Sequence, residues 1–106
     1  MTQFESIIAT IKKLKPELTT NYGVSSIGLF GSVVRDDFSS EKSDIDIIVD
    51  FSKPVGVEFI DLAEFLEKTF KRKIDLVSRK GIKGKYFREI ESEIIYVDDC
   101  DLLKKV

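Results

Sequence analysis

The chain has 106 residues, which is enough for one domain with one hydrophobic core but not for an enzyme with a separate acceptor-binding half. Its 17 basic and 19 acidic residues give a net charge of −2, so overall charge does not favour non-specific binding to nucleic acid. The absence of histidine excludes a Ser-His-Asp triad and a histidine-based zinc site, and the single cysteine, Cys100, excludes an intramolecular disulfide. Proton transfer would therefore be carried out by Asp, Glu, Lys or Tyr.

The sequence contains no signal peptide and no apolar run long enough to cross a membrane. We therefore expect a cytoplasmic protein that has no membrane partner and does not bind nucleic acid directly. Charge is unevenly distributed: residues 36–50 contain six acids and one lysine, whereas residues 71–85 contain seven bases and one acid. This pattern fits ordinary solubilising charge, and it also fits an acidic metal-binding edge that faces a basic phosphate or partner surface.

The first third of the chain predicts one or two helices followed by a strand. Apolar residues at helical spacing indicate an amphipathic helix near the N-terminus: Phe4, Ile7, Ile8, Ile11 and Leu14. Pro16 would end or kink that helix, or begin a short second one that stops at Gly23. The apolar run Val24–Phe30 predicts a strand, Gly31 and Ser32 a tight turn, and the residues up to about Asp36 a short helix.

The remaining elements follow the same alternation. After a polar loop at 37–43, the spacing of apolar residues predicts strands at 44–51, 74–78 and 94–97 and helices at 57–70 and 85–92. Residues 1–106 are expected to form a single domain of the α/β (α+β) class. The order of elements favours a small mixed β-sheet with helices packed on one face, which leaves the other face partly open for a ligand.

Two acidic residues lie at the start of the second predicted strand. Alternate residues of a strand point to the same face, so Asp44 and Asp46 share a face with their α-carbons about 6.6 Å apart. Two carboxylates in this arrangement bind a hard divalent cation, or two cations about 3.5–4 Å apart. Asp75, within the third predicted strand, is either a third carboxylate of the same site or an edge-strand acid that faces water or pairs with Arg72.

The Gly31-Ser32 dipeptide ends the first predicted strand and begins a short helix. A helix start exposes backbone N–H groups and the positive end of the helix dipole, which suit a phosphate. Gly31 allows close approach of the backbone, and the Ser32 hydroxyl can donate to a phosphate oxygen. Gly-Ser alone is usually only a turn, and Asp-x-Asp alone is usually solvated. Together, and in this order, they suggest a site for a metal-bound nucleoside triphosphate.

The combination of Gly31-Ser32, Arg35 and the string Ser43-Asp44-Ile45-Asp46-Ile47-Ile48-Val49 resembles the nucleotidyltransferase superfamily that includes DNA polymerase beta. The small size makes the chain look like a minimal nucleotidyltransferase (MNT), the antitoxin partner of HEPN-domain toxins. The resemblance extends from about Leu18 to Val97. The chain departs from many relatives at Asp36, where they have glycine after the arginine, and this leaves the path of the connector open.

This resemblance implies a fold, a reaction and a set of site residues. The fold would be that of a nucleotidyltransferase, and the reaction would be Mg²⁺-dependent transfer of AMP from ATP to a tyrosine hydroxyl of a HEPN ribonuclease toxin. Asp44, Asp46 and Asp75 would hold the metal, and Asp75 would also help to deprotonate the acceptor. The triphosphate would be bound by Gly31, Ser32 and Arg35.

Two other functions are alternatives to this enzyme. A binding antitoxin would retain the fold and neutralise the toxin by occluding its active site. A phosphatase of the haloacid dehalogenase type also uses Asp-x-Asp, but its nucleophile directly follows an apolar strand. Here Asp44 follows a polar segment and precedes its strand, which argues against the phosphatase.

Overall fold

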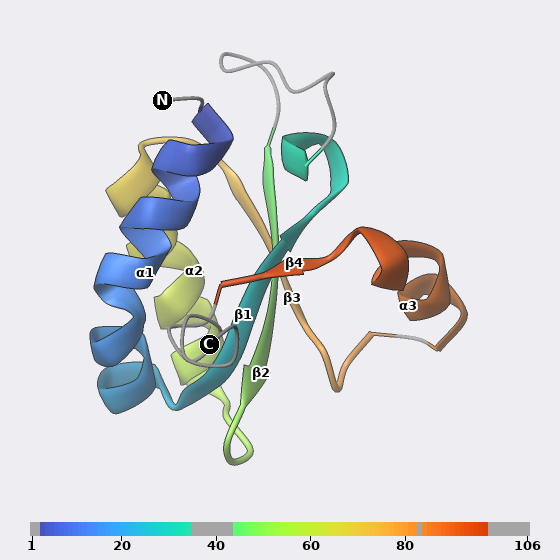
Figure 1. Cartoon of the computed structure of the whole chain (residues 1–106). Coiled ribbons are helices and arrows are strands. Elements are labelled where there is room, and N and C mark those ends of the chain that lie inside the picture. Colours follow the sequence, from blue (N-terminus) through green and yellow to red (C-terminus); the bar gives the residue numbers. More distant parts are fainter. Residues whose placement is uncertain (1–2, 35–43, 83, 98–106) are drawn as a thin grey trace, which may run out of the picture.

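The computed structural model describes residues 3–34, 44–82 and 84–97. Within these ranges four strands form one mixed sheet in the order β3-β2-β1-β4. Figure 1 shows the arrangement of the elements, whose bounds are β1 Val24–Phe30, β2 Ile45–Phe51, β3 Ile74–Ser78, β4 Ile95–Tyr96, α1 Gln3–Tyr22, α2 Val57–Phe70, α3 Gly84–Ile90, and the 3-10 turns η1 Gly31–Val34 and η2 Glu91–Glu93. No helix in the part of the chain that the structure describes is long and apolar enough to span a membrane.

The first helix is longer than the sequence predicted. α1 continues through Pro16 to Tyr22, so a separate helix beginning at Pro16 is not formed. Proline removes one backbone hydrogen bond and costs about 3 kcal/mol inside a helix. Ile11 and Leu18, on either side of Pro16, are both completely buried, and burial of each contributes about 1.5–3 kcal/mol. Packing of the whole helix on the sheet therefore offsets the cost of the proline.

Gly23 ends α1 as the sequence predicted. Its φ is +72°, in the left-handed region that glycine adopts without strain, and its N–H donates to the carbonyl of Thr19 at 3.2 Å. The chain then enters β1, and the N–H of Ser52 donates to the carbonyl of Gly23 at 2.9 Å. The start of β1 is thereby held to the end of β2.

The two faces of the sheet have different cover. Alternate residues of β2, including Ile45 and Ile47, join β1 residues and the buried side chains of α1 and α2 in the main core. Figure 1 shows α1 and α2 together on this side and α3 on the opposite side. The predicted mixed sheet with helices on one face is confirmed for the two long helices. On the other face a smaller cluster of Phe30, Ile48 and Ile90 joins α3 to the sheet, so α3 covers part of the face that was expected to be open.

The short strand β4 lies close against β1 at Gly28. Gly28 pairs with Tyr96 and Leu29 with Ile95 in antiparallel register, and the N–H of Val97 donates to the carbonyl of Ile27 at 2.8 Å. A Cβ atom at Gly28 would lie 3.0 Å from Cγ2 of Ile94, 3.1 Å from Cδ1 of Tyr96 and 3.2 Å from the carbonyl oxygen of Ile95. The absence of a side chain at Gly28 is therefore what lets β4 pair with β1.

We expect Gly28→Ala to lower the free energy of unfolding by about 1 kcal/mol, because the added methyl group forces Ile94 and Tyr96 away from β1. The measurement is urea unfolding followed by circular dichroism. Gly84→Ala is the matched control, since Gly84 has no atom within 4 Å of the position a Cβ would take. Equal or greater stability of Gly28→Ala than of the control would contradict a close β1–β4 contact.

Candidate functional site

The register of the sheet places Asp46 beside Asp75. β2 and β3 are parallel, and Asp46 pairs with Asp75 across them. Paired residues of neighbouring strands point to the same face, and such strands lie about 4.8 Å apart. Asp46 is half-buried and Asp75 is exposed. Two acids that are far apart in the sequence therefore lie side by side on the face that does not carry α1 and α2.

Asp44 lies at the same edge of the sheet, directly before β2. It is half-buried, and the N–H of the next residue, Ile45, donates to the carbonyl of Lys73 at 3.1 Å, which joins the start of β2 to the residue before β3. The sequence left two roles open for Asp75, a third carboxylate of the site or an edge-strand acid that faces water, and the structure has a feature in favour of each. Its register with Asp46 suits a shared site, and its exposure on the edge strand β3 suits an acid that faces water.

The donor chemistry of these acids fits a metal that arrives with a phosphate ligand. Among the described residues, no three Asp, Glu, His or Cys side chains lie close enough together to form a metal site by themselves. Mg²⁺ commonly binds through one or two carboxylates, keeps several waters and takes its other oxygens from substrate phosphates. The aligned carboxylates of Asp46 and Asp75 suit that mode of binding, whereas a complete protein cage would need more ligands in place.

Gly31 lies in direct contact with Asp46. Its φ is +75°, and a Cβ atom built on it would overlap Oδ2 of Asp46 and lie 3.0 Å from its Cγ. Phe30, the last residue of β1, pairs with Asp46 in the antiparallel register of β1 and β2. Both the backbone conformation and the position of the carboxylate thus require glycine here. The predicted phosphate turn and the predicted metal carboxylate are neighbours in space.

The chain beyond Gly31 forms a tighter turn than was predicted. η1 is a 3-10 turn, Gly31–Val34, where the sequence indicated a short helix to about Asp36. Ser32 is the second residue of this turn. Arg35, the third residue predicted to bind the triphosphate, lies outside the described residues, as does the predicted loop 37–43.

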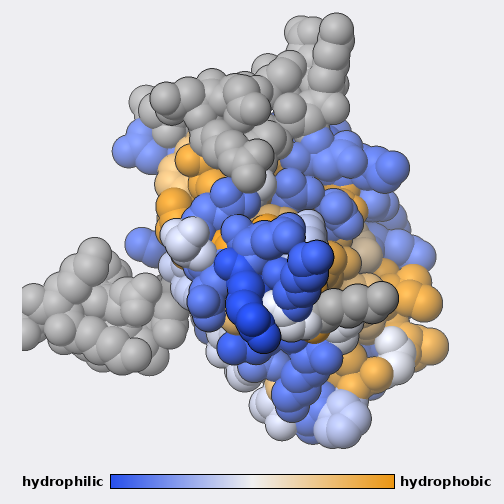
Figure 2. Space-filling model, turned by 90° about the vertical axis from the view of Figure 1, so that its right-hand side faces the viewer, coloured by the Kyte–Doolittle hydropathy of each residue, from blue (hydrophilic) through white to orange (hydrophobic). Residues whose placement is uncertain are grey.

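A cavity of about 400 Å³ opens beside this contact. Gly31 and Asp46 line it together with residues of β1, α3 and η2, namely Phe30, Tyr86, Glu89, Ile90 and Glu93. Asp44 and Asp75 are not among the lining residues. A second, mostly apolar cavity of about 510 Å³ lies next to it and is lined by Phe59, Val77, Ser78, Gly81, Ile82 and Tyr86. Figure 2, which views the molecule from the side of α3, shows hydrophilic surface over the middle of this face and hydrophobic patches beside it.

Tyr86 borders both cavities, although its place in the predicted helix 85–92 indicates only a packing role. Its side chain is 45% exposed. Partial burial raises the pKa of the Tyr86 hydroxyl, and the negative charges of Asp46, Asp75, Glu93 and Glu89 raise it further. The phenol therefore stays protonated at neutral pH and lies within the electric field of both aligned acids.

Glu89 and Glu93 were also missed in the sequence. Glu93 accepts a hydrogen bond from the N–H of Gly31 on Oε1 at 3.0 Å, in a partly buried position. The signal that could have revealed these residues is helical spacing, because Tyr86, Glu89, Ile90 and Glu93 recur at intervals of three and four residues and so share one face. The sequence indicated a packing role for Tyr86 and Ile90 and no role for the two acids of that face.

Comparison with known proteins agrees with the resemblance seen in the sequence. Residues 11–97 match the nucleotidyltransferase domain family. The chain is 40% identical to the protein adenylyltransferase MntA of Thermococcus cleftensis over 90% of its own length and 93% of that protein.

Solved structures lead to the same fold. A minimal nucleotidyltransferase superposes with a TM-score of 0.73 at 25% identity, covering 89% of this chain and 95% of that one. The complex of a tri-AMPylated Shewanella oneidensis HEPN toxin with its MNT antitoxin has a TM-score of 0.63 at 18% identity, covering 92% and 77%. The aligned acids, the glycine turn beside them and these similarities together establish that the chain belongs to the nucleotidyltransferase domain family, among relatives named as protein adenylyltransferases.

Proposed function

We propose that the chain acts as one domain and is an antitoxin that transfers AMP from ATP, with Mg²⁺, to a tyrosine hydroxyl of a cognate HEPN ribonuclease toxin. The observation that carries this proposal is the alignment of Asp46 with Asp75 next to the Gly31 turn, at the edge of a cavity. The relatives support the same assignment, since one is named a protein adenylyltransferase and another is an MNT antitoxin in complex with a tri-AMPylated HEPN toxin.

The proposed roles follow from the position of each residue. Gly31, Ser32 and Arg35 bind the triphosphate, and because the N–H of Gly31 is already donated to Glu93, the donors to phosphate are the N–H groups further along the turn. Asp44, Asp46 and Asp75 would hold Mg²⁺ together with phosphate oxygens of ATP, since these three acids do not form a metal site by themselves. When bound, the metal would neutralise phosphate charge and polarise the α-phosphorus.

Asp75 is also the group proposed to accept the proton of the acceptor hydroxyl. In the reaction the hydroxyl oxygen forms a bond to the α-phosphorus of ATP, the bond from phosphorus to pyrophosphate breaks, and the proton passes to the carboxylate. Asp75 is exposed and lies on the edge strand β3, so a hydroxyl carried by another protein can approach it.

A second candidate function is an antitoxin that works by occlusion alone. The observation that favours it is the apolar surface of α2, where Val57 is 69% and Ile60 is 58% exposed. Such side chains suit a protein–protein contact whether or not AMP is transferred. The two candidates differ in whether the acids are needed for neutralisation.

Replacement of either aligned acid should abolish most of the transfer. Asp75→Asn removes the proton acceptor, and we expect the rate of AMP transfer from labelled ATP to the toxin to fall by roughly a hundredfold or more. Asp44→Ala combined with Asp46→Ala should stop transfer, because the metal loses two of its three proposed carboxylates. Asp50→Asn is the matched control, since Asp50 lies at the other end of β2 and its Oδ1, which accepts from the N–H of Phe51 at 3.0 Å, is retained. Transfer that persists in the double variant would refute the assigned metal site.

Gly31→Ala should inactivate the enzyme by displacing Asp46. The added methyl group overlaps the carboxylate, and a shift of about 1 Å in a catalytic group costs roughly a hundredfold in rate. Gly23→Ala is a close control, because Gly23 has a similar φ of +72° but only contacts of 3.9 Å around the added atom. Both variants should lose comparable stability in thermal unfolding, and only Gly31→Ala should lose transfer. Normal transfer by Gly31→Ala would show that Asp46 is not fixed by this contact.

Neutralisation in cells separates transfer from occlusion. We expect the variant with alanine at Asp44, Asp46 and Asp75 to fail to protect cells that express the toxin, because toxin without AMP remains active. Protection is measured as colony formation, with co-purification of toxin and antitoxin as the control for binding. Full protection by a variant that still binds would favour occlusion.

A further inference from the structure

The pairing of β1 with β4 extends beyond the strands to Gly31. Gly28 pairs with Tyr96 and Leu29 with Ile95, so the same antiparallel register, carried two residues further, sets Gly31 opposite Glu93. At this point the chain is in η2 and no longer in a strand. The N–H of Gly31 donates to Oε1 of Glu93 at 3.0 Å, so a side chain takes the place of a backbone acceptor. A residue 62 positions away in the sequence thereby holds the first residue of the turn.

The hydrogen bond to Glu93 holds Gly31, the residue whose backbone conformation the candidate site depends on most. Gly31 has its left-handed φ of +75° and lies against Asp46. A bond from its N–H to a partly buried oxygen acceptor fixes the orientation of that peptide. The position of the peptide sets both the space left for Asp46 and the start of η1.

Glu93 is itself held in place by the packing of the residues that follow it. The next residue, Ile94, packs in the small cluster with Phe30 and Ile48, and β4 follows directly. The close approach of Ile94 and Tyr96 to Gly28 keeps this segment against β1. The carboxylate is thus presented to Gly31 by packed structure rather than by a free side chain on the surface.

We propose that Glu93 is a positioning residue of the nucleotide site, which keeps the Gly31 turn in the conformation that binds the triphosphate. This inference rests on the proposed function, because it concerns the same site. Glu93 acts through Gly31 and Asp46 and takes no part in bond making. Its carboxylate orders the Gly31 turn before ATP binds, and this reduces the loss of conformational entropy on binding.

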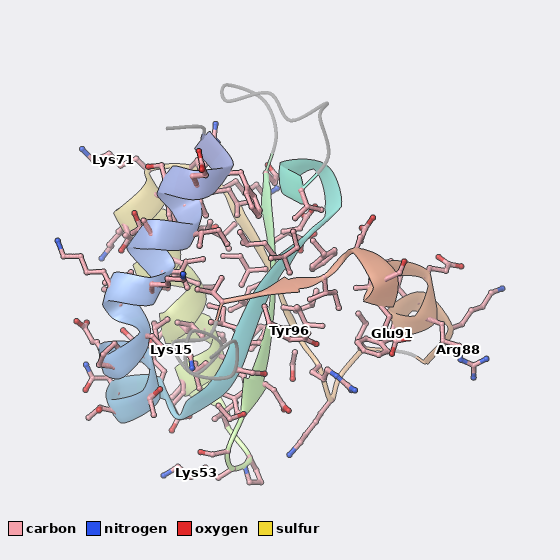
Figure 3. The ribbon with its side chains drawn as sticks, in the orientation of Figure 1. Lys15, Lys53, Lys71, Arg88, Glu91 and Tyr96 are labelled. Carbon is pink, nitrogen blue, oxygen red and sulfur yellow. The ribbon has the colours of Figure 1, made fainter. Side chains whose placement is uncertain are left out.

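Two substitutions at Glu93 distinguish the contribution of the hydrogen bond from that of the negative charge. Glu93→Gln keeps an oxygen acceptor and removes the charge, whereas Glu93→Ala removes both. Glu91→Ala is the control, since Glu91 is exposed on the same turn η2, on the side of α3 (Figure 3), and does not line the cavity.

The test measures KM and kcat for ATP in AMP transfer, at a temperature where circular dichroism shows every variant folded. We expect Glu93→Ala to raise KM for ATP roughly tenfold, the factor that corresponds to about 1.4 kcal/mol. Glu93→Gln should stay within about twofold of the wild-type KM, because the acceptor is kept. Amide hydrogen exchange at Gly31 should be faster in Glu93→Ala and unchanged in Glu93→Gln and Glu91→Ala.

Three outcomes would overturn the proposal. A lower melting temperature of Glu93→Ala with unchanged KM would show a purely structural role. A lower KM in both Glu93 variants would show that the carboxylate competes with the triphosphate. Unchanged exchange at Gly31 in Glu93→Ala would exclude the positioning role independently of activity, whereas absence of AMP transfer by the wild-type protein would refute the proposed function itself.

Discussion

The contact between Gly31 and Asp46 is the constraint on which the site depends. β1 and β2 are antiparallel, so the end of β1 meets the start of β2, and β2 and β3 are parallel, so their starts coincide. The glycine turn, Asp46 and Asp75 therefore meet at one edge of the sheet because of strand direction alone. The missing side chain at Gly31 then lets the turn and the carboxylate share the same space.

Local patterns in the sequence predicted much of the fold. The bounds of β1, α2 and β3 agree with the prediction because period-two and helical spacing report which residues of a segment face the core. The prediction that Pro16 interrupts the first helix was wrong, because local helix propensity does not include the burial of Ile11 and Leu18 against the sheet. The strand order and the register of Asp46 with Asp75 depend on pairing between distant segments, which periodicity does not report.

For the candidate site, the sequence pointed to individual residues but not to their neighbours in space. Gly31 could be chosen because it follows an apolar run, where a strand gives way to a turn, and Asp46 because it lies at the start of the next apolar run. The helical spacing of Tyr86 and Glu93 is visible in the sequence, but the strand that this helical face packs against is not. Both residues were therefore missed. That face lies over β1 and β2, and the cavity beside it is lined by residues between 30 and 46 and between 86 and 93, which are far apart in the sequence.

The alternation of β2 explains how so short a chain combines a core with a polar site. Ile45, Ile47 and Val49 are buried under α1 and α2, and Asp46 lies between them in sequence but on the opposite face. Since the two faces do not share side chains, stability rests mainly on one and the proposed chemistry on the other. On this second face α3 combines packing with the proposed site, because Ile90 packs on Phe30 and Ile48 while Tyr86 on the same helix lines the cavity beside Asp46. The cover over the second face is thus both a small core and a wall of the cavity, which explains why the residues that complete the site come from it.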